Sequence, residues 1–350
     1  MLDDIRLQNF RSYNDSSFEF NTGVNIIVCP NGSGKTNLLE AIMVVCVGRS
    51  YRVYDTDLIE FKSEWSRLEA HTSDGHHERI VKLTREPTAK TFEINNKKTK
   101  RLGSDSTLPI VVFEPNHLQL IHGSPDQRRN YLDDILDIIK PGFSTFRNNY
   151  KRVLQQRNSL LKKLNKPTSM ELFPWDLRLS ELGAAIVRAR EDYIKTINPE
   201  LSLLYKTLSS SKTKTTIKYK SQFPIESYES HLLRSLEQNL SKDILRGFTT
   251  HGPHRDDFNI ILNNHPAQET ASRGETRTTI LALKIIELKE IERVTGRSPT
   301  LLLDDVFSEL DGARRRALTS HLHDYQTFIT TTDADVVIKH FTNCSIIPLS

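Results

Sequence analysis

Apolar residues follow two different periods along this chain, and the change of period divides it into three parts. In the first part, short apolar runs such as residues 5–10 and 24–28 have the length of strands and are separated by polar turns. In the middle, apolar residues recur every three or four positions over 143–161 and 175–197, which predicts long amphipathic helices. The last part returns to apolar strands and one strong helix at 276–292.

Further local signals complete this pattern. Short apolar runs predict strands at residues 17–20, 68–71, 79–83, 92–94, 108–113, 258–262, 300–303 and 327–330. Asn95-Asn96 suits a turn between two of these strands. Ser124, Pro125 and Gln127 have the form of a capping box that starts a helix ending near residue 139. Residues 207–216 are polar and predict a loop.

The order of these elements predicts an α/β protein with a helical insertion. We expect a head with a β-rich N-terminal subdomain over residues 1–115 and a helical arm, or second lobe, over 116–206. A second head segment is expected over 207–350. The 350 residues are enough for about two domains of this kind.

The strongest chemical signal is the octapeptide C-P-N-G-S-G-K-T at residues 29–36, directly after an apolar strand. A strand that enters a glycine-rich turn and then a helix opening with Lys-Thr is typical of a phosphate loop, whose backbone N–H groups point at the phosphates. We expect Lys35 to reach the β- and γ-phosphates of ATP and the Thr36 hydroxyl to ligate Mg²⁺. The nucleotide-binding residues predicted here are Pro30, Asn31, Gly32, Ser33, Gly34, Lys35, Thr36 and Asn37.

Cys29 departs from the phosphate-loop pattern G-x-x-x-x-G-K-[ST], because it stands where the first glycine belongs. Glycine tolerates backbone conformations that are closed to other residues. A cysteine with positive φ would therefore strain the loop by about 1–3 kcal/mol, whereas a cysteine with negative φ would be harmless. We expect ATP to bind in both cases, and more weakly if the loop is strained.

Two carboxylates supply the second half of the predicted nucleotide site. Asp304 and Asp305 follow the apolar run at 300–303. A buried strand that ends in an acid beside a phosphate loop places that acid on the Mg²⁺ shell. We therefore assign Asp304 to the metal with Thr36, Asp305 to water activation, and catalysis to both acids with Lys35. Helix capping is the alternative explanation for a pair of acids after a strand.

A second anion site is predicted where the helix at 276–292 begins. Ser272-Arg273-Gly274-Glu275 precedes this helix, and the N–H groups and dipole of a helix N-terminus attract anions. Two further segments follow the acidic pair, S-E-L-D at 308–311 and T-T-T-D at 330–333. Together these segments add Ser272, Gly274, Glu275, Asp311 and Thr332 to the candidate nucleotide-binding residues.

Composition restricts the setting in which this chemistry takes place. The chain is 37% hydrophobic and 26% charged, as in soluble globular proteins, and its apolar runs are far shorter than the ~20 residues that span a bilayer. The acidic start Met1-Leu2-Asp3-Asp4 lacks the cations of a signal peptide, so we expect a cytoplasmic protein without membrane contact. Three scattered cysteines indicate neither a disulfide framework nor a zinc site.

Basic clusters make nucleic acid a candidate partner, in agreement with a net charge of +4. Such cations neutralise phosphates without reading sequence. A solvated surface is the better explanation of any single cluster, but together the clusters favour binding to the DNA backbone. The clusters are Lys97, Lys98, Lys100 and Arg101; Lys151, Arg152, Arg157, Lys162, Lys163 and Lys166; and Lys212, Lys214, Lys218 and Lys220.

The order of these motifs resembles the ATP-binding-cassette heads of the branch shared with SMC and Rad50 proteins. Asn9-Phe10-Arg11-Ser12-Tyr13 also looks like that branch, in which a basic residue, here Arg11, approaches the nucleotide. Other segments narrow the resemblance to the RecF family of bacterial repair proteins over essentially the whole chain. These segments are G-P-H-R-D-D at 252–257, G-S-P at 123–125 with Arg128, Arg129, Leu132 and Asp133, the stretch 150–162, and Trp175-Asp176 with 181–183.

The resemblance implies a DNA-binding ATPase of recombinational repair. Such proteins dimerise with ATP, hydrolyse it slowly as a switch in a DNA-dependent manner, and help RecO and RecR place a recombinase on gapped DNA at stalled replication. In cassette heads the Ser-x-Gly segment meets the γ-phosphate held by the partner, which implies a homodimer with Ser272 and Gly274 acting in trans. The implied ligands are ATP, Mg²⁺, double-stranded DNA and gap junctions.

Two other classes of function explain part of the sequence. A P-loop kinase would account for the phosphate loop but not for residues 272–275. A scaffold that binds ATP without turnover stays open because of Cys29. A transporter ATPase is disfavoured because its helical insertion is usually much shorter, and an SMC or Rad50 head because its coiled coil would be far longer than the arm at 116–206.

Overall fold

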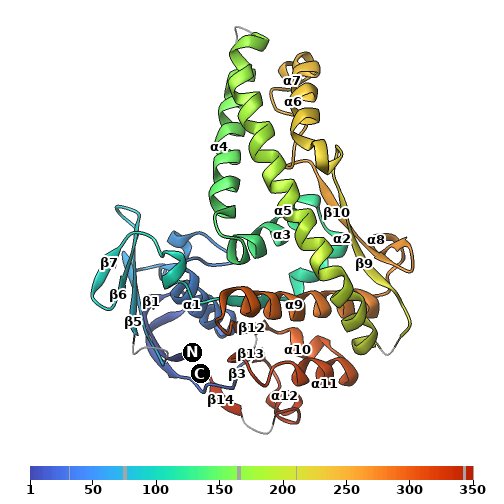
Figure 1. The fold of residues 1–350 in the computed structure, drawn as a ribbon. Coiled ribbons are helices and arrows are strands. Elements are labelled where there is room, and N and C mark those ends of the chain that lie inside the picture. Colours follow the sequence, from blue (N-terminus) through green and yellow to red (C-terminus); the bar gives the residue numbers. More distant parts are fainter. Residues whose placement is uncertain (31, 74–76, 164–166, 210, 342–343, 350) are drawn as a thin grey trace. The chain divides into compact units, whose positions relative to one another are not determined.

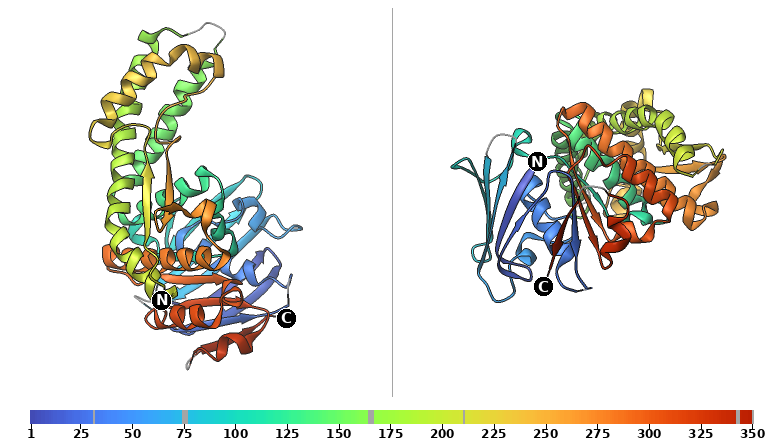
Figure 2. Two further views of the ribbon diagram at one scale, coloured as in Figure 1. Left: turned by 90° about the vertical axis from the view of Figure 1, so that its right-hand side faces the viewer. Right: turned by 90° about the horizontal axis from the view of Figure 1, so that it is seen from below.

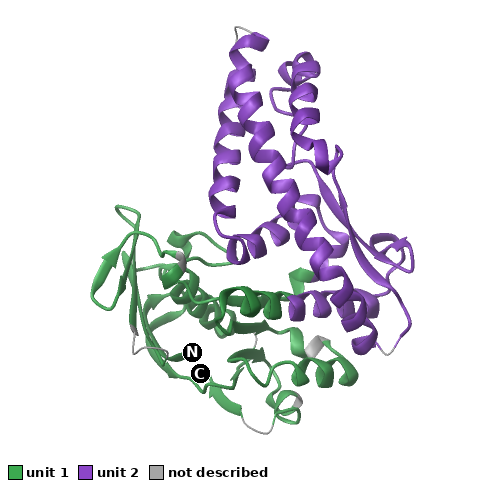
Figure 3. Cartoon of the chain, in the orientation of Figure 1, with its two compact units in different colours: residues 1–117, 287–350 green, residues 118–286 purple. Residues whose placement is uncertain are grey.

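The computed structural model describes residues 1–349 except 31, 74–76, 164–166, 210 and 342–343, and the side chains of 77, 104, 308, 309 and 336 lie outside the description. The chain forms two compact units (Figure 3). Unit 1 comprises residues 1–117 and 287–350, and unit 2 comprises residues 118–286. No helix in the described part of the chain is long and apolar enough to cross a bilayer.

The first sheet of unit 1 has six antiparallel strands in the order β2-β1-β4-β5-β6-β7 (Figure 1). Its strands are β1 (Leu2–Phe10), β2 (Tyr13–Glu19), β4 (Trp65–Thr72), β5 (His77–Thr84), β6 (Ala89–Ile94) and β7 (Lys97–Thr99). Asn95 and Asn96 join β6 to β7 with φ of 49° and 64°. Asparagine tolerates this left-handed backbone, so a turn lies where we predicted it, but the strand that follows, β7, was not among the predicted strands.

The second sheet of unit 1 has five parallel strands in the order β14-β3-β13-β12-β8. They are β3 (Val24–Val28), β8 (Ile110–Phe113), β12 (Thr300–Asp304), β13 (Thr327–Thr331) and β14 (Cys344–Pro348). The sequence gives no signal for β14, because Ser and Pro weaken its apolar run; proline is tolerated there because β14 is an edge strand. Since parallel strands point the same way, β3, β13 and β12 end at one edge of the sheet.

Helix α1 (Lys35–Val47) lies between the two sheets (Figure 2). One buried cluster joins its apolar side chains to Leu68 of the antiparallel sheet and to Leu302 and Phe328 of the parallel sheet. The sequence predicts a single apolar face, but a helix covered on two sides is apolar nearly all round. The buried residues of α1 are Lys35, Leu38, Leu39, Glu40, Ala41, Ile42, Val44, Val45 and Cys46.

Short helices complete unit 1, and one long helix crosses its boundary. The short ones are η1 (Asp55–Leu58), η2 (Ser104–Ser106), η3 (Pro115–Leu118), α10 (Val306–Glu309), α11 (Gly312–Ser320) and α12 (Ala334–Ile338). Helix α9 (Arg273–Thr295) begins in unit 2 and ends in unit 1. It contains the predicted helix 276–292 and starts three residues earlier, at Arg273.

Unit 2 combines long helices with a three-stranded antiparallel sheet in the order β11-β10-β9. The helices are α2 (Gln119–His122), α3 (Pro125–Ile139), α4 (Phe143–Leu161), α5 (Ser169–Ser209), η4 (Ile225–Ser227), α6 (Tyr228–Gln238), α7 (Leu240–Arg246) and α8 (Ala267–Thr270). The strands are β9 (Thr215–Lys220), β10 (Asp257–Leu262) and β11 (His265–Pro266). The capping box predicted at Ser124 and Gln127 is present at the start of α3.

Unit 2 extends further along the chain than the arm predicted at 116–206. Strand β9 pairs with β10 and packs against α5, and α6 packs against α5 as well. Residues 207–286 therefore belong to unit 2, although we predicted them in the second head segment. The loop predicted at 207–216 contains the end of α5 and the start of β9, whose Thr and Lys residues hide the strand signal.

The box at 252–257 forms a polar core inside unit 2. Asp256 is 1% exposed and its carboxylate accepts hydrogen bonds from Tyr219 Oη (3.0 Å), Tyr228 Oη (3.4 Å) and the Gln222 amide (3.1 Å). Burial raises the pKa of Asp256 to about 6, and the hydrogen bonds oppose this shift. Burial also lowers the pKa of His254 to about 4, so this imidazole is neutral near pH 7. These contacts give the box a structural role.

Arg157 is the most deeply buried cation of unit 2, and the prediction that it belongs to a surface cluster is wrong. Its side chain is 0% exposed. The guanidinium of Arg157 in α4 donates to Asp176 of α5, to Asp243 of α7 at 2.7 Å and to Thr249 Oγ1 at 2.9 Å. Charge alone does not reveal burial, and the matching acids lie far apart in the sequence. This network therefore ties two helices and a loop to α4.

We expect Arg157→Met to destabilise unit 2, because Asp176 and Asp243 would be left buried without a cation. The free energy of unfolding should fall by about 3–5 kcal/mol. The chain has two tryptophans, Trp65 in unit 1 and Trp175 in unit 2. Urea unfolding followed by tryptophan fluorescence in a Trp65→Phe background therefore reports on unit 2.

The matched control for this measurement is Arg178→Met. Arg178 pairs with Glu181 at the surface of α5, where the two side chains are 54% and 42% exposed. Removing an exposed pair of this kind costs at most about 1 kcal/mol. Equal effects of the two substitutions would show that the buried network does not hold unit 2 together.

Candidate nucleotide-binding site

The turn between β3 and α1 has the backbone geometry of a phosphate loop. Gly32 and Gly34 have positive φ, 88° and 93°, which glycine adopts without steric cost. Apart from the chain neighbours of Gly32, no atom of the described residues lies within 4 Å of the position that a Cβ on Gly32 would take, so this side of the loop is open. Left-handed residues in such a turn direct successive N–H groups into an anion-binding concavity. Asn31, a predicted contact, lies outside the described residues.

The turn between β1 and β2 supports the loop from behind. Tyr13 Oη donates a hydrogen bond to the Gly34 carbonyl at 3.0 Å, and burial raises the pKa of this phenol, which keeps its proton. Gly34 has a positive φ, and a Cβ there would lie 2.8 Å from Ser12 Oγ, so a larger residue would strain the turn. Asn37, which we predicted to contact the nucleotide, donates to Ser12 Oγ at 3.0 Å. The loop is therefore held in place before any ligand arrives.

Cys29 sits in this loop without the strain that a positive φ would bring. Of the described non-glycine residues, those with positive φ do not include Cys29. Its side chain is 3% exposed, its amide donates to the Thr331 carbonyl at 3.3 Å, and its carbonyl accepts from Lys35 Nζ at 2.9 Å. Cysteine is therefore accommodated at the first position of the phosphate loop without backbone strain.

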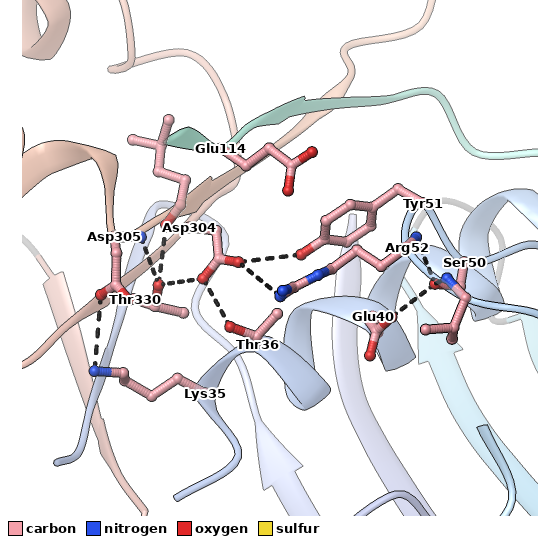
Figure 4. Close-up of polar contacts among 12 residues, drawn as sticks. Lys35, Thr36, Glu40, Ser50, Tyr51, Arg52, Glu114, Asp304, Asp305 and Thr330 are labelled. Atoms are coloured by element: carbon pink, nitrogen blue, oxygen red, sulfur yellow. Dashed lines mark hydrogen bonds and ion pairs between the residues drawn. The ribbon is translucent and has the colours of Figure 1, made fainter. Parts of the chain in front are cut away.

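Asp304 accepts hydrogen bonds from hydroxyl groups of neighbouring elements (Figure 4). Its Oδ1 atom accepts from Thr36 Oγ1 of α1 at 3.1 Å and from Thr330 Oγ1 of β13 at 2.9 Å. Its Oδ2 atom accepts from Tyr51 Oη at 3.3 Å and lies 3.7 Å from a guanidinium nitrogen of Arg52. Burial and the carboxylates of Asp304 and Glu114 raise the pKa of Tyr51, so its phenol remains a donor.

The side chains brought together here fit Mg²⁺ and the phosphates of ATP. The predicted metal ligands Thr36 and Asp304 are within hydrogen-bond distance of each other. Hydroxyl and carboxylate oxygens are the ligands that Mg²⁺ prefers, with the remainder supplied by phosphates and water. Lys35 lies beside them, 4% exposed, with its ammonium on the loop.

Asp305 lies on the other side of Thr330. Its amide donates to Thr330 Oγ1 at 2.9 Å, and its carboxylate lies 3.7 Å from Lys35 Nζ. The backbone of Asp305 is left-handed, with φ 55°, a conformation that Asp and Asn tolerate better than most residues. Burial raises the pKa of Asp305 and Lys35 opposes the shift. A raised pKa makes this carboxylate a better proton acceptor while Lys35 keeps it ionised.

Residues that sequence reasoning missed complete the site. Thr330 touches both acids and belongs to T-T-T-D, in which we singled out Thr332 instead. Tyr51 and Arg52 follow α1 without a recognisable spacing. Glu40, 1% exposed, accepts from Arg11 at 2.8 Å and from Ser50 Oγ at 2.7 Å. The predicted contact Arg11 thus lies against α1.

The remaining predicted residues serve as helix caps or lie at the surface. Ser272 and Glu275 exchange hydrogen bonds of 2.9 and 3.3 Å as a capping box of α9 in unit 2, with Gly274 between them. Asp311 caps α11 by accepting from the Arg314 amide at 2.9 Å, and this bond lowers the pKa of Asp311. Thr332 is exposed after β13. The structure does not bring Asp311 or Thr332 into the cluster around Asp304.

We expect Cys29→Gly to leave ATP affinity within tenfold of the natural chain, a difference of about 1.4 kcal/mol, because the loop is not strained at Cys29. Isothermal titration of ATP with Mg²⁺ measures this difference. Gly34→Ala is the control that should weaken binding, since a Cβ there meets Ser12 at 2.8 Å. A gain above tenfold on replacing Cys29 would contradict the unstrained geometry.

Thr330→Val should weaken Mg²⁺-dependent ATP binding about tenfold, a typical result of losing one or two buried hydrogen bonds. The substitution removes the hydroxyl that orients Asp304 and holds the Asp305 amide. ATP affinity is measured with Mg²⁺ and again with a chelator, and the loss should appear only with Mg²⁺. Thr330→Ser keeps the hydroxyl and should keep the affinity. An equal loss in the chelator would mean that the loop itself had been damaged.

Comparisons with known proteins agree with this geometry. A family model described as an AAA domain matches residues 4–293. The DNA replication and repair protein RecF of Heliobacterium modesticaldum is 38% identical over 339 residues, 94% of this chain and 91% of the relative. That of Streptococcus gordonii is 37% identical over 354 residues, 98% of this chain and 95% of the relative.

Solved structures lead to the same family. The structure of the recombination mediator protein RecF-ATPrS in the RecFOR pathway has a TM-score of 0.88 and 31% identity, over 99% of this chain and 96% of that one. An Smc head domain from Pyrococcus furiosus has a TM-score of 0.54 at 16% identity, over 100% of this chain and 94% of that one, and shows the shared fold alone. The predicted cassette-type P-loop fold is confirmed. By motif, sequence and structure, this chain belongs to the RecF family of DNA replication and repair proteins.

Proposed function

We propose that this protein is an ATP-operated switch that binds DNA and assists recombinational repair. The observation that carries the proposal is the cluster of Thr36, Thr330 and Asp304 at the shared edge of three parallel strands, with Lys35 and Asp305 beside it. This arrangement suits a nucleotide triphosphate with Mg²⁺. The similarity to the RecF-ATPrS structure supports the same ligand.

Each side chain has a defined task in ATP turnover. Lys35 exchanges its bond to the Cys29 carbonyl for phosphate oxygens, and Thr36 and Asp304 hold Mg²⁺. The metal, when bound, neutralises charge on the transferred phosphoryl group. Asp305 orients the attacking water and accepts its proton. Its side chain is one methylene shorter than the Glu that many cassette ATPases carry, which supports slow turnover suited to switching, and the resemblance to the RecF family adds dependence on DNA.

The start of α9 supports assembly into a homodimer. Ser272 is exposed at the N-terminus of this 23-residue helix, next to Gly274. Backbone N–H groups at a helix N-terminus attract phosphate, and in cassette heads this segment meets the nucleotide of the partner. We infer that Ser272, Gly274 and Glu275 close over the ATP of a second copy, and that hydrolysis releases the two copies.

The wider pathway follows from family membership and surface charge. We infer that the protein binds double-stranded DNA and gap junctions through phosphates, works with RecR- and RecO-type mediators in the cytoplasm, and helps load a recombinase on single-strand gaps. A P-loop kinase leaves the α9 segment unexplained. A scaffold without turnover loses support, because Cys29 was its main argument and Cys29 does not have a positive φ.

The molar mass in solution should double when ATP and Mg²⁺ are added, because the nucleotide joins two copies. Light scattering with and without ATP, and then with duplex DNA, measures this change. Ser272→Arg should bind ATP but stay monomeric, whereas Lys35→Met should lose both ATP binding and the dimer. Asp305→Asn, which keeps the left-handed backbone, should prolong the dimer by slowing hydrolysis.

A monomer under every condition, with ATP binding demonstrated, would refute the role of Ser272 in trans. A dimer that Ser272→Arg does not weaken would place the interface elsewhere. The control is Ser241→Arg, an exposed serine of α7, which should dimerise like the natural chain.

A further inference from the structure

Strand β9 of unit 2 presents a row of lysines on one face. Side chains along a strand alternate between its two faces, so residues two apart lie on the same side, about 7 Å from each other. Thr215 and Ile217 are buried, whereas Lys218 and Lys220 are exposed. Lys212 and Lys214, at even positions just before the strand, are exposed too. The strand therefore fixes Lys218 and Lys220 on its solvent-facing side, and Lys212 and Lys214 lie in the segment that leads into it.

The opposite face of β9 is occupied by α5. Tyr219 Oη accepts a hydrogen bond from Arg190 of α5 at 3.2 Å and donates one to Asp256. These contacts fix which face is turned to the protein and which to solvent. The lysines therefore cannot turn inward without breaking the buried polar core around Asp256.

Protection of a sheet edge is the ordinary explanation for lysines on a strand of this kind. Here the edge is already blocked by Asn198 of α5. Its side-chain amide donates to the Ile217 carbonyl at 2.9 Å and accepts from the Ile217 amide at 2.6 Å. While Asn198 occupies Ile217, in the middle of β9, another strand cannot pair along the whole edge, so the lysines are not needed to repel one.

The charge of the row is not cancelled by its neighbours. Asp257 stands opposite Lys220 in the register with β10, but it is engaged by the Arg128 guanidinium through bonds of 2.7 and 2.8 Å. Asn259 stands opposite Lys218. In the part of the chain that the structure describes, no carboxylate lies within ion-pair distance of Lys212, Lys214, Lys218 or Lys220.

We propose that the lysine row of β9, consisting of Lys212, Lys214, Lys218 and Lys220, is a surface of unit 2 that binds the phosphate backbone of duplex DNA. Two of these ammonium groups lie on one face of a rigid strand and two in the segment just before it, and cations gathered in this way neutralise phosphates without reading bases. The proposal rests on the proposed DNA-binding function and assigns a place to it. It also separates this row from Arg157, which belongs to the core.

The test uses the full chain with ATP and Mg²⁺ and a fluorescent 30-base-pair duplex of arbitrary sequence. The variant Lys214→Gln, Lys218→Gln, Lys220→Gln should bind more than tenfold more weakly at 0.1 M salt. The slope of log K against log salt concentration should fall by about 2 to 3, since each phosphate contact contributes about 0.9. A second duplex of unrelated sequence should give the same result.

The matched control is Lys62→Gln, Lys140→Gln, Lys339→Gln, which removes the same charge from exposed positions outside the basic clusters. Its salt slope should stay within one unit of the natural chain. An equal loss in both triple variants would show a general charge effect and overturn the assignment. So would an unchanged slope in the β9 variant while the natural chain binds duplex.

The proposed DNA-binding function and the lysine row are overturned by different results. If the natural chain itself does not bind duplex with ATP, the proposed DNA function fails and the row fails with it. Doubling of the molar mass with ATP in the β9 variant shows that the nucleotide switch and the fold are intact. If the β9 variant loses both that doubling and DNA binding, the substitutions have damaged the protein. The double variant Lys218→Gln, Lys220→Gln is then measured in its place. An unchanged salt slope in this double variant would overturn the proposal.

Discussion

The shared edge of strands β3, β13 and β12 is the constraint on which the nucleotide site depends. The phosphate loop leaves β3, the two acids end β12, and Thr330 of β13 lies between them. Because the strands are parallel, functional residues that are separated by most of the chain lie along the same edge of the sheet. The Thr330 hydroxyl bridges the side chain of Asp304 and the backbone of Asp305, so a shift of β13 would misplace both carboxylates together.

Burial around this edge strengthens the electrostatic interactions among the charged side chains of the site. Lys35 and Asp304 are 4% and 5% exposed, and electrostatic interactions strengthen where water is excluded. Helix α1 contributes Lys35 and Thr36 and is itself enclosed by two sheets, which limits its movement. The core that stabilises unit 1 is thus the same core that positions the phosphate-binding residues.

The local motifs of the site could be predicted from sequence because their chemistry is contiguous. Each motif can be recognised within a few positions, at residues 29–36 and at the pair Asp304 and Asp305. Parallel strands then bring the two motifs together in space. Thr330 and Tyr51 could not be found in this way, since their role exists only through neighbours in space. Arg157 was assigned to the surface because a cation in a sequence does not reveal the acids that bury it. Helix packing, not charge pattern, decides that outcome.

Strand β9 and the length of unit 2 could not be predicted from the sequence for a related reason. Alternating Thr and Lys lower the hydrophobic signal of a strand, although its inward residues pack well against α5. The chain therefore stays with the helices for about eighty residues longer than polarity suggests. Such a strand is stabilised by what covers it, and a single sequence does not say what that is.

The left-handed backbone at Asp305 limits which residues could replace this carboxylate in the course of evolution. Short polar side chains accept that conformation, but longer ones give up part of their preference for it. A change to Glu would lengthen the side chain and at the same time strain the peptide group whose N–H donates to Thr330 Oγ1. Replacing Asp305 by Glu is therefore not a neutral single step, because the backbone next to it would have to relax first.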